Sequence, residues 1–303
     1  MCGLAGSLEF EPATSAEALA RQVKAMADTL HHRGPDSDGQ WLDAKAGIAL
    51  GFRRLAIIDL SEHGAQPMTS HDDRYVIAYN GEVYNFPEMR VELVARGHEF
   101  NGHSDTEVIL AAIIEWGLEA AVGRFVGMFA FALWDRRERT LALVRDRLGI
   151  KPLYYAQFGQ HLIFASEIRA LRTHPAFQGD VDRDALALYL KRNCVPAPKT
   201  IFQNVHKLPM GTVLRCDGKG KIELTPYWSL RQVAEGGQAS RFQGSEADAR
   251  VELERLLAEA VRCRMVADVP LGVFLSGGVD SSTVAALMQQ QSARPVKTFS
   301  IGF

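Results

Sequence analysis

The second residue of the chain is a cysteine, Cys2, and it is followed by the small residue Gly3. Once the initiator Met1 is removed, Cys2 carries a free α-amine and a thiol on the same carbon atom. A thiol titrates at about 8.5 and an α-amine at about 7.7–8.0, so the amine can take the thiol's proton, directly or through one water. This pair predicts an activated nucleophile that needs no distant histidine. The alternative interpretation is a small residue at a frayed terminus.

A second candidate site lies near the other end of the sequence, at Ser276–Ser282 (S-G-G-V-D-S-S). A buried-type strand is predicted before it, at 269–275, and a helix after it, at 283–291. A glycine-rich turn between a strand and a helix presents backbone N–H groups beside the positive end of the helix dipole, which favours phosphate. The segment has neither the Walker A pattern nor G-x-G-x-x-G spacing. The alternative is a plain Gly-Gly turn with a capping side chain.

Two further polar positions could take part in chemistry. Asn80-Gly81 lies inside an alternating stretch, 74–85, and predicts a hairpin because both residue types tolerate positive φ. Such a turn is either a plain connection or a site where an amide side chain and an N–H together hold an oxyanion. Asp105 follows Ser104, the predicted N-cap of a helix, so it either complements the helix dipole or contacts a ligand.

The periodicity of apolar residues predicts an α+β domain of two sheets with helices against them, and not a βαβ fold. Its predicted strands are 3–10, 47–59, 74–85 (two strands), 127–135, 140–146, 152–157, 161–166, 207–216 and 221–228, and its helices are 15–30, 104–116 and 185–193. We expect this first domain to cover residues 1–228. The polar stretch 229–244 lacks periodicity and is predicted to be a linker.

The second predicted domain covers residues 245–303. It begins with a helix capped by Ser245 that runs to about Met265. The strand at 269–275 and a last strand at 296–303 would form a parallel sheet with one helix between them. Because two strands and one helix cannot bury both faces of a parallel sheet, we expect this domain to be incomplete.

Composition narrows the class of protein. The 303 residues are 47% apolar and 23% charged, which suits a globular protein of about two domains. The net charge of −2 gives no electrostatic footprint for nucleic acid or acidic membranes. The four cysteines lack C-x-x-C spacing, and neither they nor His31-His32 predict a metal site or a disulfide framework. No leader or long apolar run is evident, so we expect a cytoplasmic protein in a reducing compartment.

Six short motifs, in this order, closely resemble the glutamine-dependent asparagine synthetases, whose N-terminal half is a class II (N-terminal nucleophile) glutamine amidotransferase domain. The motifs are M-C-G-L-A-G at 1–6, H-R-G-P-D at 32–36, R-L-A-I-I-D at 54–59, N-G-E-V-Y-N at 80–85, S-D-T-E at 104–107 and S-G-G-V-D-S-S at 276–282. The resemblance implies a four-layer αββα domain followed by the start of an α/β ATP-pyrophosphatase domain. Other class II amidotransferases share a Cys-Gly start but lack the last motif, so they are set aside.

The resemblance also implies roles for individual residues. Cys2 would attack the side-chain amide of glutamine, and the Asn80 side chain with the Gly81 N–H would form the oxyanion hole. The α-carboxylate of glutamine would be held by Arg54, and its α-amine by Asp105 with Glu82. The remaining residues implied to contact glutamine are Leu55, Ala56, Ile57 and Ile58.

In the second domain the resemblance implies that ATP binds, with Mg²⁺, and activates L-aspartate as β-aspartyl-AMP. Ammonia released from L-glutamine would then give asparagine, AMP and pyrophosphate. The residues implied to contact ATP are Leu275, Ser276, Gly277, Gly278, Val279, Asp280, Ser281, Ser282 and Ile301. A homodimer is also implied. The alternatives are a related amidotransferase that acts on another carboxylate, of a cell-surface sugar or a secondary metabolite, and a glutaminase-only or non-catalytic fragment.

Overall fold

The computed structural model describes residues 1–302, and the contacts between residues divide the chain into two compact units. The first unit consists of residues 1–56 and 61–230. The second unit consists of residues 57–60 together with the chain from Arg231 onward. Each unit is described by itself below.

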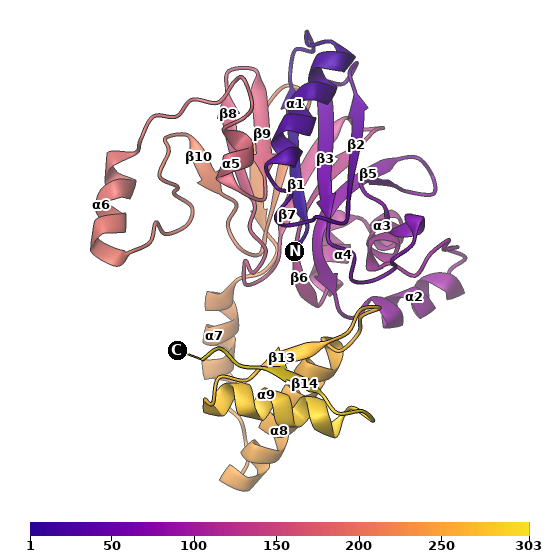
Figure 1. The fold of residues 1–303 in the computed structure, drawn as a ribbon, viewed down its shortest axis with the longest axis vertical. Coiled ribbons are helices and arrows are strands. Elements are labelled where there is room, and N and C mark those ends of the chain that lie inside the picture. The colour runs from indigo at the N-terminus through magenta and orange to yellow at the C-terminus, as the bar shows by residue number, and fades with distance from the viewer. Residues whose placement is uncertain (303) are drawn as a thin grey trace. The chain divides into compact units, whose positions relative to one another are not determined.

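Two six-stranded antiparallel sheets form the centre of the first unit (Figure 1). The first sheet has the order β10-β8-β9-β1-β3-β2, with β1 Gly3–Glu9, β2 Ser37–Asp43, β3 Ile48–Arg54, β8 Tyr154–Phe158, β9 His161–Ala165 and β10 Val205–Lys207. The second has the order β12-β11-β7-β6-β5-β4, with β4 Met68–Thr69, β5 Tyr75–Val83, β6 Gly127–Asp135, β7 Thr140–Arg145, β11 Thr212–Cys216 and β12 Ile222–Pro226.

Helices cover the outer face of each sheet. The helices of the first unit are α1 Ala16–Asp28, η1 Glu62–Gly64, α2 Phe86–Ala95, α3 Asp105–Trp116, α4 Leu118–Arg124, α5 Ile168–Leu171 and α6 Arg183–Arg192. Helix α1 packs on β1, β2 and β3, and α5 packs on β9, whereas α3 packs on β5 and is flanked by α2 and α4 (Figure 1). The order of layers is helix, sheet, sheet, helix, so the predicted αββα class is confirmed.

The main core lies between the two sheets. Leu4 of β1 and Phe52 of β3 are fully buried against residues of the facing sheet such as Trp134 of β6 and Leu214 of β11. Full burial of a side chain of this size contributes about 1.5–3 kcal/mol relative to exposure. This packing holds β1, and with it the backbone beside Cys2, in the centre of its sheet, between β9 and β3.

Most of the predicted elements are present. Ser15 caps α1 through its side chain, β6 has the predicted bounds, and β11 pairs with β12 as the predicted last hairpin. Strand β3 ends at Arg54, so the predicted strand at 47–59 is too long. The side chain of Ser104 accepts the Glu107 N–H at the start of α3, as predicted for the cap.

The predicted hairpin at Asn80-Gly81 is wrong. Both residues lie inside β5, which runs from Tyr75 to Val83 and pairs along its whole length with β6. A Cβ atom on Gly81 would lie 2.4 Å from the carbonyl oxygen of Met128. Glycine is therefore needed because two strands approach closely, and not because the chain turns.

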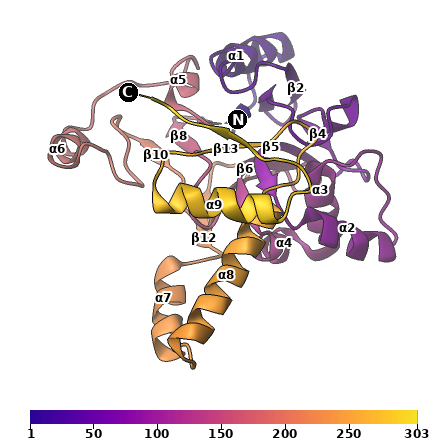
Figure 2. The same cartoon turned by 60° about the horizontal axis from the view of Figure 1, so that its bottom comes forward.

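The second unit contains α8 Glu246–Cys263, β13 Gly272–Phe274, α9 Val279–Gln290 and β14 Lys297–Phe299, and most of α7 Leu230–Ala239. β13 and β14 pair in parallel, and α9 packs between α8 and β13 (Figure 2). The capping box of Ser245 with Asp248 starts α8, as predicted. The stretch 229–244, predicted to be irregular, holds the exposed helix α7. Within residues 1–302 no helix is long and apolar enough to cross a membrane.

Candidate active site

Cys2 lies directly before β1, at the end of the central strand of its sheet. The N–H of Leu55 donates a hydrogen bond to the Cys2 Sγ at 3.3 Å, and the thiol in turn donates to the Leu55 carbonyl oxygen at 3.5 Å. The sequence places these two residues 53 positions apart, and the pairing of β1 with β3 brings them together. The thiol is therefore fixed by the backbone that follows β3.

Burial raises the pKa of the Cys2 thiol, because the thiolate loses solvation. The hydrogen bond from Leu55 and the positive charges of the N-terminal amine, Arg54 and Lys151 act in the opposite direction. In this structure the amine belongs to Met1, and burial lowers its pKa.

Arg33 holds the backbone of Cys2, although sequence reasoning gave it no role. Its Nε donates to the Cys2 carbonyl oxygen at 2.9 Å, and its Nη1 donates to Glu167 Oε1 at 2.9 Å. Glu167 is also 3.0 Å from His32 Nε2. Arg33 is only 8% exposed, so this contact is built into the unit. The only sequence signal for Arg33 was the H-R-G-P-D motif. This motif contributed to the family resemblance but did not indicate what the arginine does.

The segment that follows β3 is anchored at several points. Arg54 is 9% exposed, and its Nη1 donates to the Ser61 carbonyl oxygen at 3.1 Å. The N–H of Ala56 donates to Asp36 Oδ2 at 2.9 Å. Leu55 thus contacts Cys2 in the first unit, and Arg54 and Ala56 flank it in the chain; their predicted contact with glutamine stays a prediction.

Ile57 and Ile58, which were predicted to contact glutamine together with Arg54, belong by their contacts to the second unit. The Ile57 carbonyl oxygen accepts a hydrogen bond of 2.9 Å from the Asp268 N–H, and the Asp59 N–H donates to Asp268 Oδ2 at 2.7 Å. Both isoleucines are partly buried. Their predicted contact with glutamine stays a prediction.

Asn80 has an unusual environment for an amide side chain. It is 1% exposed, and its Nδ2 has no hydrogen-bond partner among the residues that the structure describes. A buried donor without a partner costs about 1–3 kcal/mol, so native proteins rarely keep one. Side chains alternate along a strand, so Asn80 and Glu82 lie on one face of β5 while Gly81 and Tyr79 lie on the other. The free donor of Asn80 is available for an oxygen that develops negative charge.

Asp105 occupies the first position of α3, as predicted, and is 5% exposed. Its Oδ2 accepts hydrogen bonds from the Tyr79 hydroxyl at 2.6 Å and from the Val83 N–H at 3.0 Å. Burial raises the pKa of Asp105, and the bond from Tyr79 opposes this effect. Asp105 therefore fastens α3 to β5 on either side of Glu82.

Lys151 is a second residue that sequence reasoning missed. It follows β7 and is 6% exposed. Burial lowers the pKa of its ammonium, while the charges of Glu82 and Cys2 raise it. Lys151, which follows β7, is thus affected by the charges of both Glu82 in β5 and Cys2.

In the second unit, the motif Ser276–Ser282 begins between β13 and α9 and continues into α9. Gly277 has φ of +83°, a conformation open to glycine, and Gly278 is the extended N-cap residue of α9. The Ser281 hydroxyl lies 3.1 Å from the Ser276 hydroxyl and donates to the Gly278 carbonyl oxygen at 3.2 Å. The helix begins at Val279, not at 283 as predicted. The last residues of the motif are therefore in its first turn, where the dipole favours an anion.

The two flanking positions implied to contact ATP lie at the carboxyl ends of the parallel strands. Leu275 donates its N–H to the Phe299 carbonyl oxygen at 2.8 Å, and its own carbonyl oxygen accepts from the Ser300 hydroxyl at 2.6 Å. Ile301 follows and is 75% exposed. In α/β sheets this edge is where ligands usually bind.

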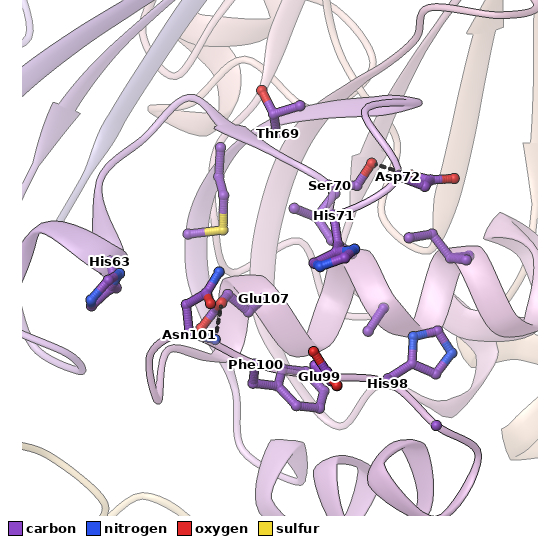
Figure 3. A pocket seen from close by; sticks show the side chains of 15 residues that line it. His63, Thr69, Ser70, His71, Asp72, His98, Glu99, Phe100, Asn101 and Glu107 are labelled. Carbon is purple, nitrogen blue, oxygen red and sulfur yellow. Dashed lines mark hydrogen bonds between the residues drawn. The ribbon is translucent and has the colours of Figure 1, made fainter.

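A separate cavity of about 520 Å³ lies between α3, the turn after β4 and the loop before α3 (Figure 3). Its walls carry His63, His71, His98, Glu99 and Phe100, with apolar residues of α3 as the floor. Among the described residues that line it, none was predicted to contact glutamine or ATP. No group of three or more His, Cys, Asp or Glu side chains within residues 1–302 could hold a metal ion.

Comparison with known proteins agrees with the fold. Residues 1–228 match the glutamine amidotransferase domain family, and residues 252–303 match the asparagine synthase family. Because the first match covers well over half of the chain, the chain belongs to the glutamine amidotransferase domain family. The predicted resemblance to glutamine-dependent asparagine synthetases is confirmed by these matches and by the relatives below.

Asparagine synthetase (glutamine-hydrolyzing) 1 of Bacillus subtilis is 38% identical over 305 residues, which are 100% of this chain and 46% of that protein. A putative asparagine synthetase (glutamine-hydrolyzing) 2 of Methanocaldococcus jannaschii is 34% identical over 323 residues, 100% of this chain and 60% of that protein. The chain thus spans about half the length of such relatives.

A solved structure of glutamine phosphoribosylpyrophosphate amidotransferase from B. subtilis is similar with a TM-score of 0.55 and 16% identity. The match covers 99% of this chain and 65% of that one. At this level of identity the likeness concerns the fold alone.

Proposed function

We propose that the first unit hydrolyses L-glutamine to glutamate and ammonia, with Cys2 as the nucleophile. The observation that carries the proposal is the unpartnered, buried Nδ2 of Asn80 in the same unit as a thiol anchored to Leu55. A donor kept unpaired in the resting protein suits an oxygen that appears only during reaction.

The reaction would proceed in two steps. The thiol of Cys2 gives its proton to the α-amine that Met1 removal exposes, and the sulfur attacks the side-chain carbonyl carbon of glutamine. The oxyanion formed accepts hydrogen bonds from the Asn80 amide and the Gly81 N–H. The intermediate collapses to a γ-glutamyl thioester as the amine's proton leaves with the nitrogen as ammonia. Water then attacks the thioester, releases glutamate and restores the thiol.

The substrate's charged end would be held by the remaining residues of the site. Arg54, at the end of β3, would bind the α-carboxylate through charge-assisted hydrogen bonds. Glu82 would bind the α-ammonium, with Asp105 supporting it from α3. Asp105 already accepts two hydrogen bonds from β5, so its part is to hold the local backbone as much as to contact substrate.

For the whole protein we propose a glutamine-dependent asparagine synthetase that uses ATP and Mg²⁺ to activate L-aspartate as β-aspartyl-AMP. The positive φ of Gly277 and the N-terminus of α9 suit the binding of pyrophosphate oxygens. Leu275 and Ile301 would flank the nucleotide. Mg²⁺ would arrive mainly on the phosphates, as it usually does. A cytoplasmic location and a homodimer remain predictions.

A second candidate function is amidation of a different carboxylate, such as that of a cell-surface sugar or a secondary metabolite. It is kept because the chain spans about half of its relatives. It shares the glutaminase step, so the two candidates differ only in the acceptor of ammonia.

Release of glutamate from glutamine by the purified protein tests the proposal. Mass spectrometry first confirms that Met1 has been removed. Hydrolysis by the processed protein and its loss in Cys2→Ala is the expected result. Equal hydrolysis by both proteins would contradict the assignment of Cys2. Asparagine formed when ATP and aspartate are added would support the synthetase, and its absence with hydrolysis intact would support the glutaminase-only alternative.

A further inference from the structure

Ser166 and Glu167 lie between the end of β9 and the start of α5. The Ser166 N–H donates to the Leu4 carbonyl oxygen at 2.9 Å, and the Ser166 hydroxyl oxygen accepts the Leu4 N–H at 3.1 Å. In a regular antiparallel ladder a backbone carbonyl oxygen would accept that N–H. Ser166, which is fully buried, thus extends the pairing of β1 with β9 to a position two residues from Cys2.

Glu167 is the N-cap residue of α5, but its side chain makes no capping hydrogen bond. Residues that cap helices well are Ser, Thr, Asp and Asn, whose side-chain oxygen accepts an N–H of the first turn. The Glu167 Oε1 instead accepts Arg33 Nη1 at 2.9 Å and lies 3.0 Å from His32 Nε2, while its Oε2 lies 3.2 Å from Arg169 Nε. Burial acts to raise the pKa of Glu167, but the hydrogen bonds from Arg33 and His32 outweigh it and the pKa is lowered. The carboxylate is therefore an ionised partner of Arg33 and not a cap.

The guanidinium of Arg33 connects this carboxylate to the candidate nucleophile. The Arg33 side chain is 7% exposed, and its Nε donates to the Cys2 carbonyl oxygen at 2.9 Å. A buried guanidinium is costly unless an opposite charge pairs with it, and Glu167 supplies that charge in a charge-assisted hydrogen bond. The carbonyl carbon of Cys2 is bonded to the Cα that carries the thiol and the amine. A contact that fixes the carbonyl group therefore limits the directions of both.

We propose that Glu167 is a positioning residue of the glutaminase site, whose carboxylate orients the Arg33 guanidinium so that Nε holds the Cys2 carbonyl group. The contacts of Glu167 are with Arg33, His32 and Arg169, so it acts on Cys2 through Arg33. This inference rests on the proposed function only for its effect on turnover, since the contacts exist without glutamine.

The first experiment observes the carbonyl group of Cys2 in the absence of glutamine. The protein is labelled with carbonyl-¹³C cysteine, and the ¹³C NMR signal of Cys2 is identified by its absence in Cys2→Ser. The carbonyl signal shifts when the hydrogen bond to it is lost. In Glu167→Ala the signal is expected to move in the same direction as in Arg33→Ala. Glu167→Gln keeps an oxygen that accepts Arg33 Nη1, so it should leave the signal near that of the parent protein.

Glu115 of α3 is a matched control because it has partners of the same two kinds. Its Oε1 accepts Arg96 Nη1 at 3.0 Å, and its Oε2 lies 3.1 Å from His98 Nε2. The Glu115 side chain is 27% exposed and that of Glu167 is 25% exposed. Glu115→Ala therefore removes a comparable pair of interactions in the same unit. It should leave the Cys2 signal in place and keep kcat for glutamine within about twofold of the parent protein.

The second experiment is a double-mutant cycle for glutamine hydrolysis. Glu167→Ala is expected to lower kcat about tenfold with a smaller change in KM, because a displaced nucleophile is misaligned for attack. In the Arg33→Ala background the same substitution should cost less than a further twofold, since the carboxylate acts through the guanidinium. Glu167→Gln should recover most of kcat. Arg169→Ala removes only an exposed partner of Glu167 and should leave kcat unchanged.

An unmoved Cys2 signal in Glu167→Ala would overturn the proposal. So would a tenfold loss of kcat that persists without Arg33, or an equal shift in Glu167→Gln and Glu167→Ala, because that pattern reports charge and not orientation. The NMR measurement uses no glutamine, so failure of hydrolysis in the parent protein would count against the proposed function alone. If Glu167→Ala does not fold, Glu167→Asp is measured instead. Its shorter side chain keeps the charge and must move the Cys2 signal for the proposal to stand.

Discussion

Replacement of Asn80 by alanine should separate activity from stability, because its Nδ2 is buried without a partner within residues 1–302. Loss of one oxyanion donor typically costs about 2.7–4 kcal/mol of barrier, so kcat for glutamine hydrolysis should fall about 100- to 1,000-fold. KM should change little, because the Asn80 amide binds the oxyanion of the transition state more strongly than it binds the carbonyl oxygen of bound glutamine.

The effect on stability follows from two opposing terms. Removing an unpaired buried donor relieves a penalty of about 1–3 kcal/mol. The cavity left by the amide group, of roughly 40 Å³, costs about 1 kcal/mol at ~24 cal/mol per Å³. Asn80→Ala should therefore be as stable as the parent protein or up to about 2 kcal/mol more stable, measured by denaturant unfolding.

Asn85 offers a matched control in the same region. Its Nδ2 donates to the Arg124 carbonyl oxygen at 3.1 Å, and its Oδ1 accepts the Val126 N–H at 2.9 Å. Asn85→Ala breaks two satisfied bonds and should lose about 1–3 kcal/mol of stability while kcat stays within about twofold. The reasoning is refuted if Asn80→Ala keeps full kcat, or if it loses as much stability as Asn85→Ala.

Three other predictions concern the surroundings of the site. Gly81→Ala places a Cβ 2.4 Å from the Met128 carbonyl oxygen and should cost about 1–3 kcal/mol in denaturant unfolding; unchanged stability would contradict the close strand approach. Arg33→Ala removes the donor to the Cys2 carbonyl oxygen and should lower kcat about tenfold or more, with partial recovery in Arg33→Lys; a kcat equal to the parent's in both would show that the contact is dispensable. Burial lowers the pKa of His174 to about 4 from an ordinary 6.5, so the unfolded chain binds more protons between these values and the free energy of unfolding should fall by ~3 kcal/mol as pH drops from 6.5 to 4. His174→Gln should flatten that dependence, and an unchanged slope would rule His174 out as its source.

Features set by local sequence were predictable. Apolar periodicity located α1 and the strands from β6 to β9, and the serine caps of α3 and α8 begin those helices as expected. The order of strands and helices was sufficient for an α+β domain of two sheets with helices against them, and the family resemblance implied the αββα layers. The family motifs then indicated which polar residues to examine.

Features that depend on contacts far apart in sequence were not predictable. Gly81 has the local sequence pattern of a hairpin turn. Glycine is required there for a different reason, because the backbone of β6 lies too close to leave room for a Cβ atom. The hydrogen bond from Arg33 to Cys2 spans 31 positions, and no periodicity signals it. The backbone of Lys151 is held by Asp146, which accepts its N–H, and by Arg145, which donates to its carbonyl oxygen, in a turn that sequence patterns describe only as a connection.

The most direct test of the central claim is a search for a γ-glutamyl group on Cys2 during turnover. Protein with Met1 removed is mixed with glutamine, quenched in acid and digested, and the N-terminal peptide is examined by mass spectrometry. We expect the γ-glutamyl adduct on Cys2, and we expect it to accumulate over the free enzyme when deacylation is slow. Added hydroxylamine should remove the adduct and produce glutamyl hydroxamate. Glutamine hydrolysis that continues with no adduct and no hydroxamate would contradict a covalent role for Cys2.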